Sequence, residues 1–378
     1  MVSVSICSPS AKAATAFADL ARRSPPNVFM TPAALCAAQD TGFADIRVLQ
    51  AWDDAGPAPK LVGFWALQVR RPLPLWPAVL EALPYNYAFL SSPLVDPAFA
   101  SEVIPAFLTA IRQASDLPKV LHLASFEQER PCLALLQREL AVQGGAHRLL
   151  DEVGRPFATR QANVKKSGST RKKLRQDFNR LSALGEVELV NARAPAAVAA
   201  AFETFLALEQ ASWKGARGTA LLCNPRDAAF VRRLIAGLAA EGQASVAELR
   251  INGRTIAAQV LMYCGRTAYT WKIAFDADHA RYSPGMLLVD RITEQLLADP
   301  DIEAIDSCSA GDGFMAKLWT GRRQVVEMLI QVGPGMSPAF ALEALRRRGY
   351  HAARRLRNRW RARRHPEARA ERAALAPS

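Results

Sequence analysis

The alternation of hydrophobic and polar positions between residues 43 and 153 predicts a mixed sheet with flanking helices. Ile46–Trp52 and Leu61–Val69 alternate as two antiparallel strands do, and residues 53–57 supply the turn between them. The same criteria predict three further strands and two helices: strands at Tyr85–Leu90, Val120–Ala124 and Arg148–Val153, and helices at 96–114 and 128–142.

The second half of the chain repeats this order of elements with stronger signals. Asn252-Gly253 separates two alternating segments and is the strongest short hairpin signal available. The predicted helices cover 196–211, 227–240 and 285–298, with a helical turn at 313–319, and the predicted strands cover 246–251, 255–264, 267–275, 303–307 and 325–332. Both halves then read strand, strand, strand, helix, strand, helix, strand. This coarse repeat indicates two tandem α/β units.

The segment that follows strand 267–275 has the features of an anion site. Ser283-Pro284-Gly285 is a typical helix start, with serine as the N-cap and proline in the first turn. The free N–H groups of Gly285 and Met286 would then face an anion together with the helix dipole. Capping alone also explains Ser-Pro, and the neighbouring Tyr282 either stacks on a ligand or packs. A phosphate-bearing donor of a transferred group is the functional interpretation.

The strand before this helix start carries aromatic and charged side chains. Tyr269 and Trp271 are two residues apart and should share one side of the strand, with Lys272 on the other. Aromatic residues on a central strand also pack in a core, so both roles stay open. A buried lysine needs a partner. Asp276 and Asp306 are the expected partners of Lys272.

The net charge of +13 is concentrated in two segments. Residues 155–180 carry +8 and residues 341–378 carry +9, which leaves 13 − 8 − 9 = −4 for the rest of the chain. This distribution gives no reason to expect DNA binding by the whole protein. The basic helix expected from Ser169 is either a solvated linker or a cationic wall facing an anionic substrate. The arginine-rich tail is a surface helix on anionic lipid or an acidic partner, or a partly disordered arm.

Cysteine and histidine spacing excludes the common metal and redox motifs. The six cysteines form no CxxC pair and the five histidines show no ligand spacing, so we expect no metal and no tightly bound cofactor. No secretory signal or spanning segment is visible. A cytoplasmic protein with reduced thiols is therefore expected, with peripheral contact at the inner membrane face left open.

Several motifs of the second half resemble those of the GNAT acyltransferase superfamily, and more narrowly its CelD-type and Fem-like branch. They are Glu209-Gln210-Ala211-Ser212-Trp213-Lys214-Gly215, Tyr269-Thr270-Trp271-Lys272, Tyr282-Ser283-Pro284-Gly285, Asp306, Gly311-Asp312 and Lys317-Leu318-Trp319. The resemblance covers about residues 165–330 by motif and residues 1–150 only by architecture. It departs from the R/Q-x-x-G-x-G/A pyrophosphate loop common in GNAT enzymes, because Gly285 falls one position late after Arg281.

The resemblance implies an α/β fold of two tandem GNAT-like domains, each with a mixed, mostly antiparallel sheet flanked by helices. The expected division is 1–153 for a degenerate first domain, 154–194 for a basic linker, 195–335 for the acyltransferase domain and 336–378 for the tail. Candidate site residues fall into three groups: Asp306, Glu209, Lys272 and Lys317 for catalysis, Tyr282, Ser283, Pro284, Gly285 and Met286 for the donor, and Trp213, Tyr269, Trp271 and Asp276 for the acceptor. Asp306 or Glu209 would act as the base, and Lys272 or Lys317 would stabilise negative charge.

The implied function is direct acyl transfer from an acyl-CoA, with acetyl as the expected group, to an amine or hydroxyl on a sugar, polysaccharide or cell-envelope precursor. Two alternatives remain. The donor could instead be an aminoacyl-tRNA, as in Fem-type ligases, with residues 165–175 holding RNA phosphates. The chain could also be a non-catalytic accessory protein of a polysaccharide-synthesis complex that docks through its basic tail.

Overall fold

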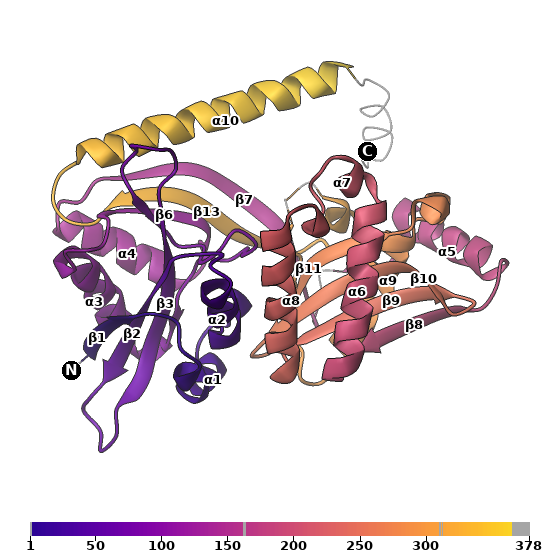
Figure 1. Cartoon of the computed structure of the whole chain (residues 1–378), viewed down its shortest axis with the longest axis horizontal. Helices are drawn as coiled ribbons and strands as arrows, with labels where there is room; N and C mark the ends of the chain where they lie inside the picture. Colours follow the sequence, from indigo (N-terminus) through magenta and orange to yellow (C-terminus); the bar gives the residue numbers. More distant parts are fainter. Residues whose placement is uncertain (1, 162–163, 310, 312, 365–378) are drawn as a thin grey trace.

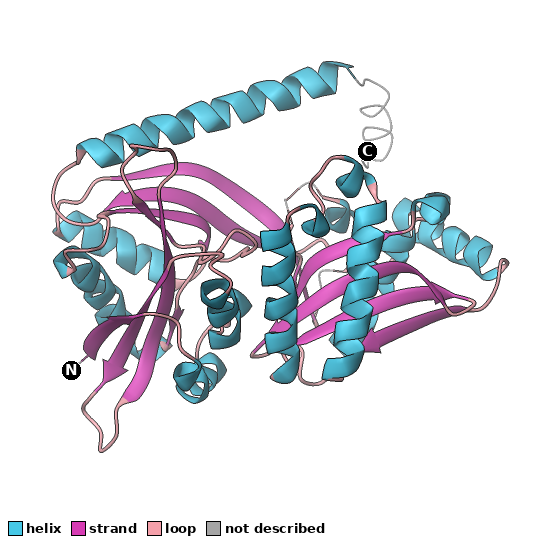
Figure 2. Ribbon diagram, in the orientation of Figure 1, coloured by secondary structure: helices cyan, strands magenta, loops and turns pink. Residues whose placement is uncertain are grey.

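The two halves of the chain share one sheet (Figures 1 and 2). The computed structural model describes residues 2–161, 164–309, 311 and 313–364. The strands lie in the order β1-β2-β3-β4-β6-β13-β7-β12-β11-β10-β9-β8, and β5 pairs with β3 outside this path. Their bounds are β1 Val2–Cys7, β2 Ile46–Asp53, β3 Lys60–Arg70, β4 Val79–Glu81, β5 Leu94–Val95, β6 Val120–Glu127, β7 His147–Thr159, β8 Val187–Ala192, β9 Ala244–Ile251, β10 Arg254–Cys264, β11 Thr267–Phe275, β12 Ala304–Asp306 and β13 Arg322–Gln331.

Helices flank this sheet in both halves, as Figure 2 shows. The α-helices are α1 Ala14–Arg23, α2 Pro32–Asp40, α3 Ala100–Gln113, α4 Pro131–Val142, α5 Ser169–Ser182, α6 Pro195–Ala211, α7 Trp213–Ala216, α8 Pro225–Ala240, α9 Pro284–Ala298 and α10 Pro338–Arg364. Short 3-10 turns occur at η1 Ala11–Ala13, η2 Val28–Met30, η3 Pro97–Phe99, η4 Leu221–Cys223, η5 Ala277–Tyr282 and η6 Phe314–Lys317. The predicted mixed α/β architecture is confirmed. Across the described ranges, no helix is both long and apolar enough to cross a membrane.

The long strand β7 joins the two halves. Its first part pairs with β13 and its last residues, Phe157 to Thr159, pair with β12. β13 also pairs with β6, so the strand expected to end the second unit lies in the N-terminal part of the sheet. The predicted boundary at 153 falls within β7. The division into domains stays a prediction, but the sheet hydrogen bonding continues across it.

Hydrophobic side chains pack on both faces of the C-terminal part of the sheet. Val260 and Met262 of β10 belong to the large core that includes α6, α8 and most of the N-terminal half. Leu261 and Tyr263, the alternating residues of the same strand, belong to a second core with α5 and α9. The C-terminal sheet is therefore covered on one face by α6 and α8 and on the other by α5 and α9.

Two stretches of the N-terminal half differ from the sequence prediction. Tyr85–Leu90 is not a strand but a turn-rich segment, whose Tyr87 carbonyl accepts a hydrogen bond from Trp271 in the other half. β1, α1 and α2, before residue 43, were not predicted at all. β1 is an edge strand that pairs only with β2 among the described strands. Its residues Val2 to Ile6 alternate strictly between hydrophobic and polar, so the sequence did carry a signal for this strand.

Candidate functional site

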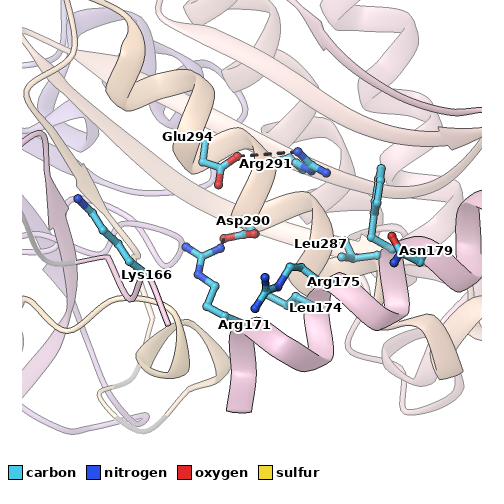
Figure 3. A pocket seen from close by; sticks show the side chains of 10 residues that line it. Lys166, Arg171, Leu174, Arg175, Asn179, Leu287, Asp290, Arg291 and Glu294 are labelled. Atoms are coloured by element: carbon cyan, nitrogen blue, oxygen red, sulfur yellow. Dashed lines mark hydrogen bonds and ion pairs between the residues drawn. The ribbon is translucent and has the colours of Figure 1, made fainter. Parts of the chain in front are cut away.

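A cationic groove lies between α5 and α9 (Figure 3). The predicted basic helix is confirmed as α5, and it packs across α9 through Leu174 and Leu287. The cavity between the two helices has a volume of about 490 Å³. Its lining residues are Lys166, Arg171, Leu174, Arg175, Phe178, Asn179, Leu287, Asp290, Arg291 and Glu294. The groove is large enough for part of a phosphate-bearing ligand.

Some cations of this groove are already paired and others are not. Arg171 pairs with Asp290 and also donates to the Lys165 carbonyl. Arg291 lies 4.4 Å from the Phe178 ring centre and 4.0 Å from Glu294. Lys166 and Arg175 make no ion pair within the described part of the chain, so their charges remain available to an anion.

The helix start expected to hold the donor phosphate has a different geometry. Ser283 is left-handed, with φ 51°, and its side chain does not cap α9. Its carbonyl instead accepts from the N–H groups of Met286 at 2.9 Å and Leu287 at 3.1 Å. Met286 N–H is therefore not free for phosphate, which corrects the expected cradle. The carbonyl of an N-cap residue commonly accepts such a bond, whereas local sequence patterns do not reveal the αL conformation of Ser283.

Neighbouring side chains keep this helix start cationic. Ser283 Oγ accepts from Lys173 of α5 at 3.2 Å. Tyr282 is buried, and the Arg281 guanidinium lies 4.8 Å from its ring centre, so Tyr282 packs and does not offer an open face. A second cavity of about 390 Å³ adjoins it, lined by Arg180, Ala183, Arg281 and Tyr282.

Gly285 and Pro284 are both buried at the first turn of α9. A Cβ on Gly285 would lie 3.4 Å from the Phe275 ring and 3.6 Å from Ile273. The glycine therefore lets α9 pack closely on β11. Its role is explained by packing, whatever ligand binds beside it.

A β-bulge in β11 changes the direction of Lys272. Val260 pairs with Lys272 and Leu261 with Thr270, which leaves Trp271 as an extra residue. The Lys272 ammonium consequently lies 5.5 Å from the Trp271 ring centre and 4.7 Å from that of Tyr87. The expectation that Lys272 and Trp271 lie on opposite sides is therefore wrong. Tyr269 lies on that side too, buried, with its hydroxyl donating to the Pro26 carbonyl at 2.7 Å.

Lys272 lies among polar groups from both halves of the protein. Burial lowers its pKa, and the nearby carboxylates of Glu209 and Asp227 counteract part of this effect. Tyr87 donates a hydrogen bond to Asp227. Lys272 makes no ion pair with any described carboxylate, so neither expected partner is found. Asp276 instead pairs with Arg254 at 2.9 Å and caps the following 3-10 turn.

Glu209 is buried beside Lys272 and fully engaged. Its Oε1 accepts from Lys214 at 2.8 Å and its Oε2 from the Leu221 N–H at 2.9 Å. The helix ends at Ala211, and Trp213 begins the separate helix α7 with an exposed side chain near Arg217. Glu209 and Trp213 are one helical turn apart in sequence, but they do not share a helix face because Ser212 interrupts the helix.

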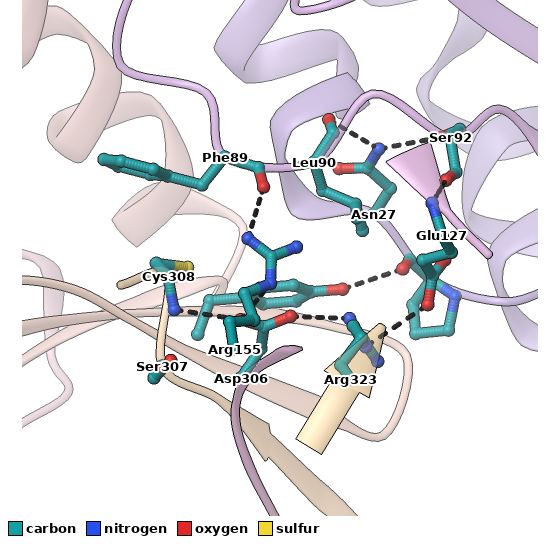
Figure 4. Close-up of polar contacts among 12 residues, drawn as sticks. Asn27, Phe89, Leu90, Ser92, Glu127, Arg155, Asp306, Ser307, Cys308 and Arg323 are labelled. Carbon is teal, nitrogen blue, oxygen red and sulfur yellow. Dashed lines mark hydrogen bonds and ion pairs between the residues drawn. The ribbon is translucent and has the colours of Figure 1, made fainter. Parts of the chain in front are cut away.

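Asp306 lies in a buried ion-pair network (Figure 4). One oxygen accepts from Arg323 at 2.7 Å, and the other lies 3.2 Å from Arg155 Nε and accepts from the Cys308 N–H at 2.9 Å. Arg323 also pairs with Glu127 at 3.2 Å. This environment favours a structural role for Asp306 over that of a general base, because both oxygens are engaged and enclosed.

Of the residues that follow Asp306 in sequence, Cys308 reaches this network through its backbone N–H, whereas Lys317 lies outside it. Lys317 is exposed and forms no ion pair with Asp306. Cys308 is buried, and burial raises the pKa of its thiol well above the usual value, which disfavours a thiolate nucleophile. Asp312, part of the resemblance, lies outside the described residues.

Sequence reasoning missed several residues that surround Lys272 and Asp306. Arg155 and Arg323 lie far from Asp306 in sequence and reach it only because β7 lies beside both β12 and β13. Tyr87 and Asp227 approach Lys272 from different halves. Of these residues, only Arg323 could have been found from the sequence, because it is a charged residue on a strand with a largely hydrophobic pattern.

One group of potential metal ligands occurs away from these clusters. Ligand atoms of Asp151, Glu327 and His351 lie within 4.8 Å of one another. Glu327 is already paired with His122 at 3.0 Å and with Arg347 at 3.4 Å, which makes ion pairing the simpler explanation.

Comparison with known proteins identifies relatives of the fold and of one part of the chain. Residues 168–314 match the family model described as an acetyltransferase (GNAT) domain. No curated protein sequence matches the chain. Among solved structures, FemX has a TM-score of 0.58 at 10% identity, covering 86% of this chain and 97% of FemX.

Two other solved structures have similar folds. The C-terminal domain of an Agrobacterium fabrum protein assigned as a lysylphosphatidylglycerol synthetase has a TM-score of 0.56 at 16% identity, covering 90% of this chain and 96% of that one. A Bacteroides thetaiotaomicron protein of unknown function has a TM-score of 0.54 at 12% identity, covering 87% and 100%. At these identities the likeness concerns the fold alone. The family match extends over residues 168–314, and within them the chain is similar to an acetyltransferase (GNAT) domain.

Proposed function

We propose that the protein transfers an acyl group directly from an acyl-CoA to an amine or hydroxyl acceptor. The observation that carries the donor assignment is the cationic surface formed by α5 and the start of α9. Lys166 and Arg175 form no ion pair with any residue that the structure describes, and Arg180 and Arg281 line the adjoining cavity. CoA carries a pyrophosphate and a further phosphate, which such a surface would bind.

The transfer itself would take place on the opposite face of the sheet, near Lys272. β11 and β12 pair only over Thr267–Tyr269 and Ala304–Asp306, and a donor could pass where the two strands separate. The acceptor nitrogen or oxygen would attack the acyl carbon, the C–S bond would break, and the CoA sulfur would take up a proton. Lys272 would stabilise the negative charge that develops on the acyl oxygen.

Glu209 and Asp227 are the carboxylates near this point. Asp227 is half-buried, whereas Glu209 is enclosed, so Asp227 is the more accessible proton acceptor. The acceptor would be a sugar, polysaccharide or cell-envelope precursor, as the CelD-type and Fem-like resemblance implies. The exposed side chain of Trp213, next to Lys214 in sequence, would contact this acceptor.

Calorimetry with acetyl-CoA and longer acyl-CoAs tests the donor. We expect Arg175→Ala combined with Arg281→Ala to weaken binding by about tenfold or more, since each charged phosphate contact contributes about 1 kcal/mol or more. Arg148→Ala is the matched control, because Arg148 is an exposed arginine on β7 outside the groove. Removal of the 3′-phosphate from CoA should weaken wild-type binding as well. If no CoA species binds, the donor assignment is wrong.

The length of α5 also favours a second candidate donor, an aminoacyl-tRNA. The helix has 14 residues, about 21 Å, and presents Arg171, Lys172, Arg175 and Arg180 along it. This length is greater than that of one pyrophosphate group, so the helix could contact several phosphates of an RNA backbone. If tRNA is the donor, binding will fall steeply with salt concentration and α5 variants will reduce the slope, while CoA will not compete.

A further inference from the structure

The part of the arginine-rich tail that the structure describes forms the helix α10, Pro338–Arg364, whose inner face packs on the N-terminal half. Phe340 and Ala344 pack with Val79 in a small apolar cluster. Arg347 pairs with Glu81 at the end of β4. The one acidic residue of α10, Glu343, is buried and pairs with arginines of the same helix. The inner face therefore sets the orientation of the helix without a partner.

The outer face of α10 carries an exposed apolar stripe. Leu342, Leu345 and Leu356 recur at helical spacing, and the side chains of Leu345 and Leu356 are 67% and 64% exposed. Small residues occupy the positions between them: Gly349, Ala352 and Ala353. By helical geometry, Arg348 and Arg355 flank the stripe on one side and Arg357 on the other. No acid lies on this face between residues 338 and 357.

A loop from elsewhere in the sequence presents the same chemistry next to α10. Residues 71–78 connect β3 to β4, and Figure 1 shows this loop reaching α10 at the end of the sheet. The link is direct, because Val79 packs on α10. The loop contains Leu73 and Leu75, 49% and 101% exposed, follows two exposed arginines, Arg70 and Arg71, and contains no acid.

Leu75 combines full solvent exposure with a strained backbone conformation. Its φ of 63° lies in the left-handed region, which costs a non-glycine residue about 1 kcal/mol. A fully exposed leucine held in such a backbone gains nothing within the monomer. Its exposure has an evident use only against an apolar phase or partner.

We propose that α10 and the loop 71–78 together form a surface that docks on an anionic lipid membrane. The leucines would enter the boundary between headgroups and acyl chains, and the arginines around them would contact lipid phosphates while their aliphatic stems cover apolar surface. Neither element spans the bilayer. The docked inner face of α10 holds the helix parallel to the surface that it contacts.

Charge and the spacing of the leucines favour a lipid membrane over two other binding partners, a second copy of the chain and an acidic helix. A second copy of the chain would place two arginine-rich faces against each other, which like-charge repulsion opposes. An acidic helix in a groove would need a row of large apolar residues to contact, yet Gly349, Ala352 and Ala353 interrupt the leucines. A fluid anionic interface needs only scattered apolar anchors and surrounding cations.

Vesicle co-sedimentation of the full chain tests this surface. We expect binding to vesicles of phosphatidylcholine mixed with an equal share of phosphatidylglycerol, and at least about tenfold weaker binding to phosphatidylcholine alone. The triple variant Leu75→Gln, Leu345→Gln, Leu356→Gln should bind the anionic vesicles about tenfold or more weakly. Leu184→Gln, at another half-exposed leucine in the C-terminal half, should bind like the wild type. All these positions are exposed, so circular dichroism should show unchanged folding.

Four results would overturn the proposal. The first is no binding to anionic vesicles. The second is binding by the triple variant equal to that of the wild type, which indicates electrostatic adsorption alone. The third is a dimer in solution that the triple variant abolishes, and the fourth is tighter binding to polyglutamate than to vesicles. Arg348→Gln with Arg355→Gln should weaken vesicle binding even when the leucines are intact.

Discussion

The ammonium group of Lys272 lies against two aromatic rings and forms no ion pair with a carboxylate of the described residues, a costly arrangement for a charged side chain. Burial lowers its pKa, whereas Glu209 and Asp227 raise it. We therefore expect Lys272 to titrate below a normal lysine and Asp227→Asn to lower its pKa further. The rate of amine acylation at Lys272, followed by mass spectrometry across pH, measures both. A higher pKa in Asp227→Asn would contradict this electrostatic explanation.

At Asp306, stability and chemistry make opposite predictions. Replacement by Asn removes a buried negative charge between Arg155 and Arg323, and loss of one member of such a network costs about 3–5 kcal/mol. We expect that loss in urea denaturation of Asp306→Asn. Asp276→Asn, whose arginine partner is exposed, should cost less than about 1 kcal/mol. Unchanged stability in Asp306→Asn together with abolished transfer would instead restore Asp306 as the base.

The sequence was more informative about which charged residues to consider than about the residues with which they pair. The sequence singled out Lys272, Glu209 and Asp306 as candidate catalytic residues, and in the structure Glu209 and Asp306 are buried and burial lowers the pKa of Lys272. It assigned the wrong partners, because pairing depends on a bulge at Trp271 and on strand neighbours far away in sequence. The Ser283 geometry is a similar case, since an αL residue before proline leaves no signal in hydrophobic periodicity.

Elements with strong periodicity or turn signals were predictable almost to their ends. The hairpin around Asn252-Gly253 and the helix that begins at Pro284 agree with the structure within a few residues. Elements stabilised by tertiary contacts were not. The segment Tyr85–Leu90 has strand composition, but its side chains and carbonyls bond to the other half, as the contacts of Tyr87 with Trp271 and of Phe89 with Arg155 illustrate.

Within α10, Gly349 is a weak point that can be tested by itself. The glycine lies inside the helix, and a Cβ there would meet no atom within 4 Å. Gly349→Ala should therefore stabilise the protein by about 0.5–1 kcal/mol through lower unfolded-state entropy. Gly285→Ala is the contrast, because its Cβ would lie 3.4 Å from Phe275 and should gain less or destabilise. Thermal unfolding of the two variants measures the difference, and equal effects would contradict it.

The arrangement of the whole molecule is the part that the sequence predicted least. The repeat of elements suggested two tandem α/β units. The sheet shows instead that β13, near the end of the chain, lies between β6 and β7. Local patterns define a strand but not its neighbours, and only the long strand β7 hints that one element serves both halves. Folding of the N-terminal half consequently depends on residues after 320.

A buried charge network at this junction makes stability depend on pH. His122 of β6 contacts Glu81 of β4 and Glu327 of β13, and Arg347 of α10 pairs with both carboxylates. Burial alone would raise the pKa of Glu81 and Glu327, but His122 and Arg347 outweigh it and lower both to about 2. Burial likewise opposes the charge on His122, yet the carboxylates raise its pKa above the ordinary value.

These shifts give stability a limit on each side of neutral pH. The two carboxylates contribute stability above their unfolded pKa of 4.5, and this is lost as pH falls from there toward about 2. His122 contributes below its unfolded pKa of 6.5, and that part is lost as pH rises through the higher folded value. Urea denaturation at constant ionic strength should therefore show the free energy of unfolding decreasing on both sides, by roughly 3 kcal/mol for each carboxylate at the acid limit. His122→Gln should remove the alkaline decrease and reduce the acid one, because His122 is the first of the groups that lower the pKa of both carboxylates. A wild-type profile that is flat above pH 6.5 would mean that His122 is not charged in the folded protein.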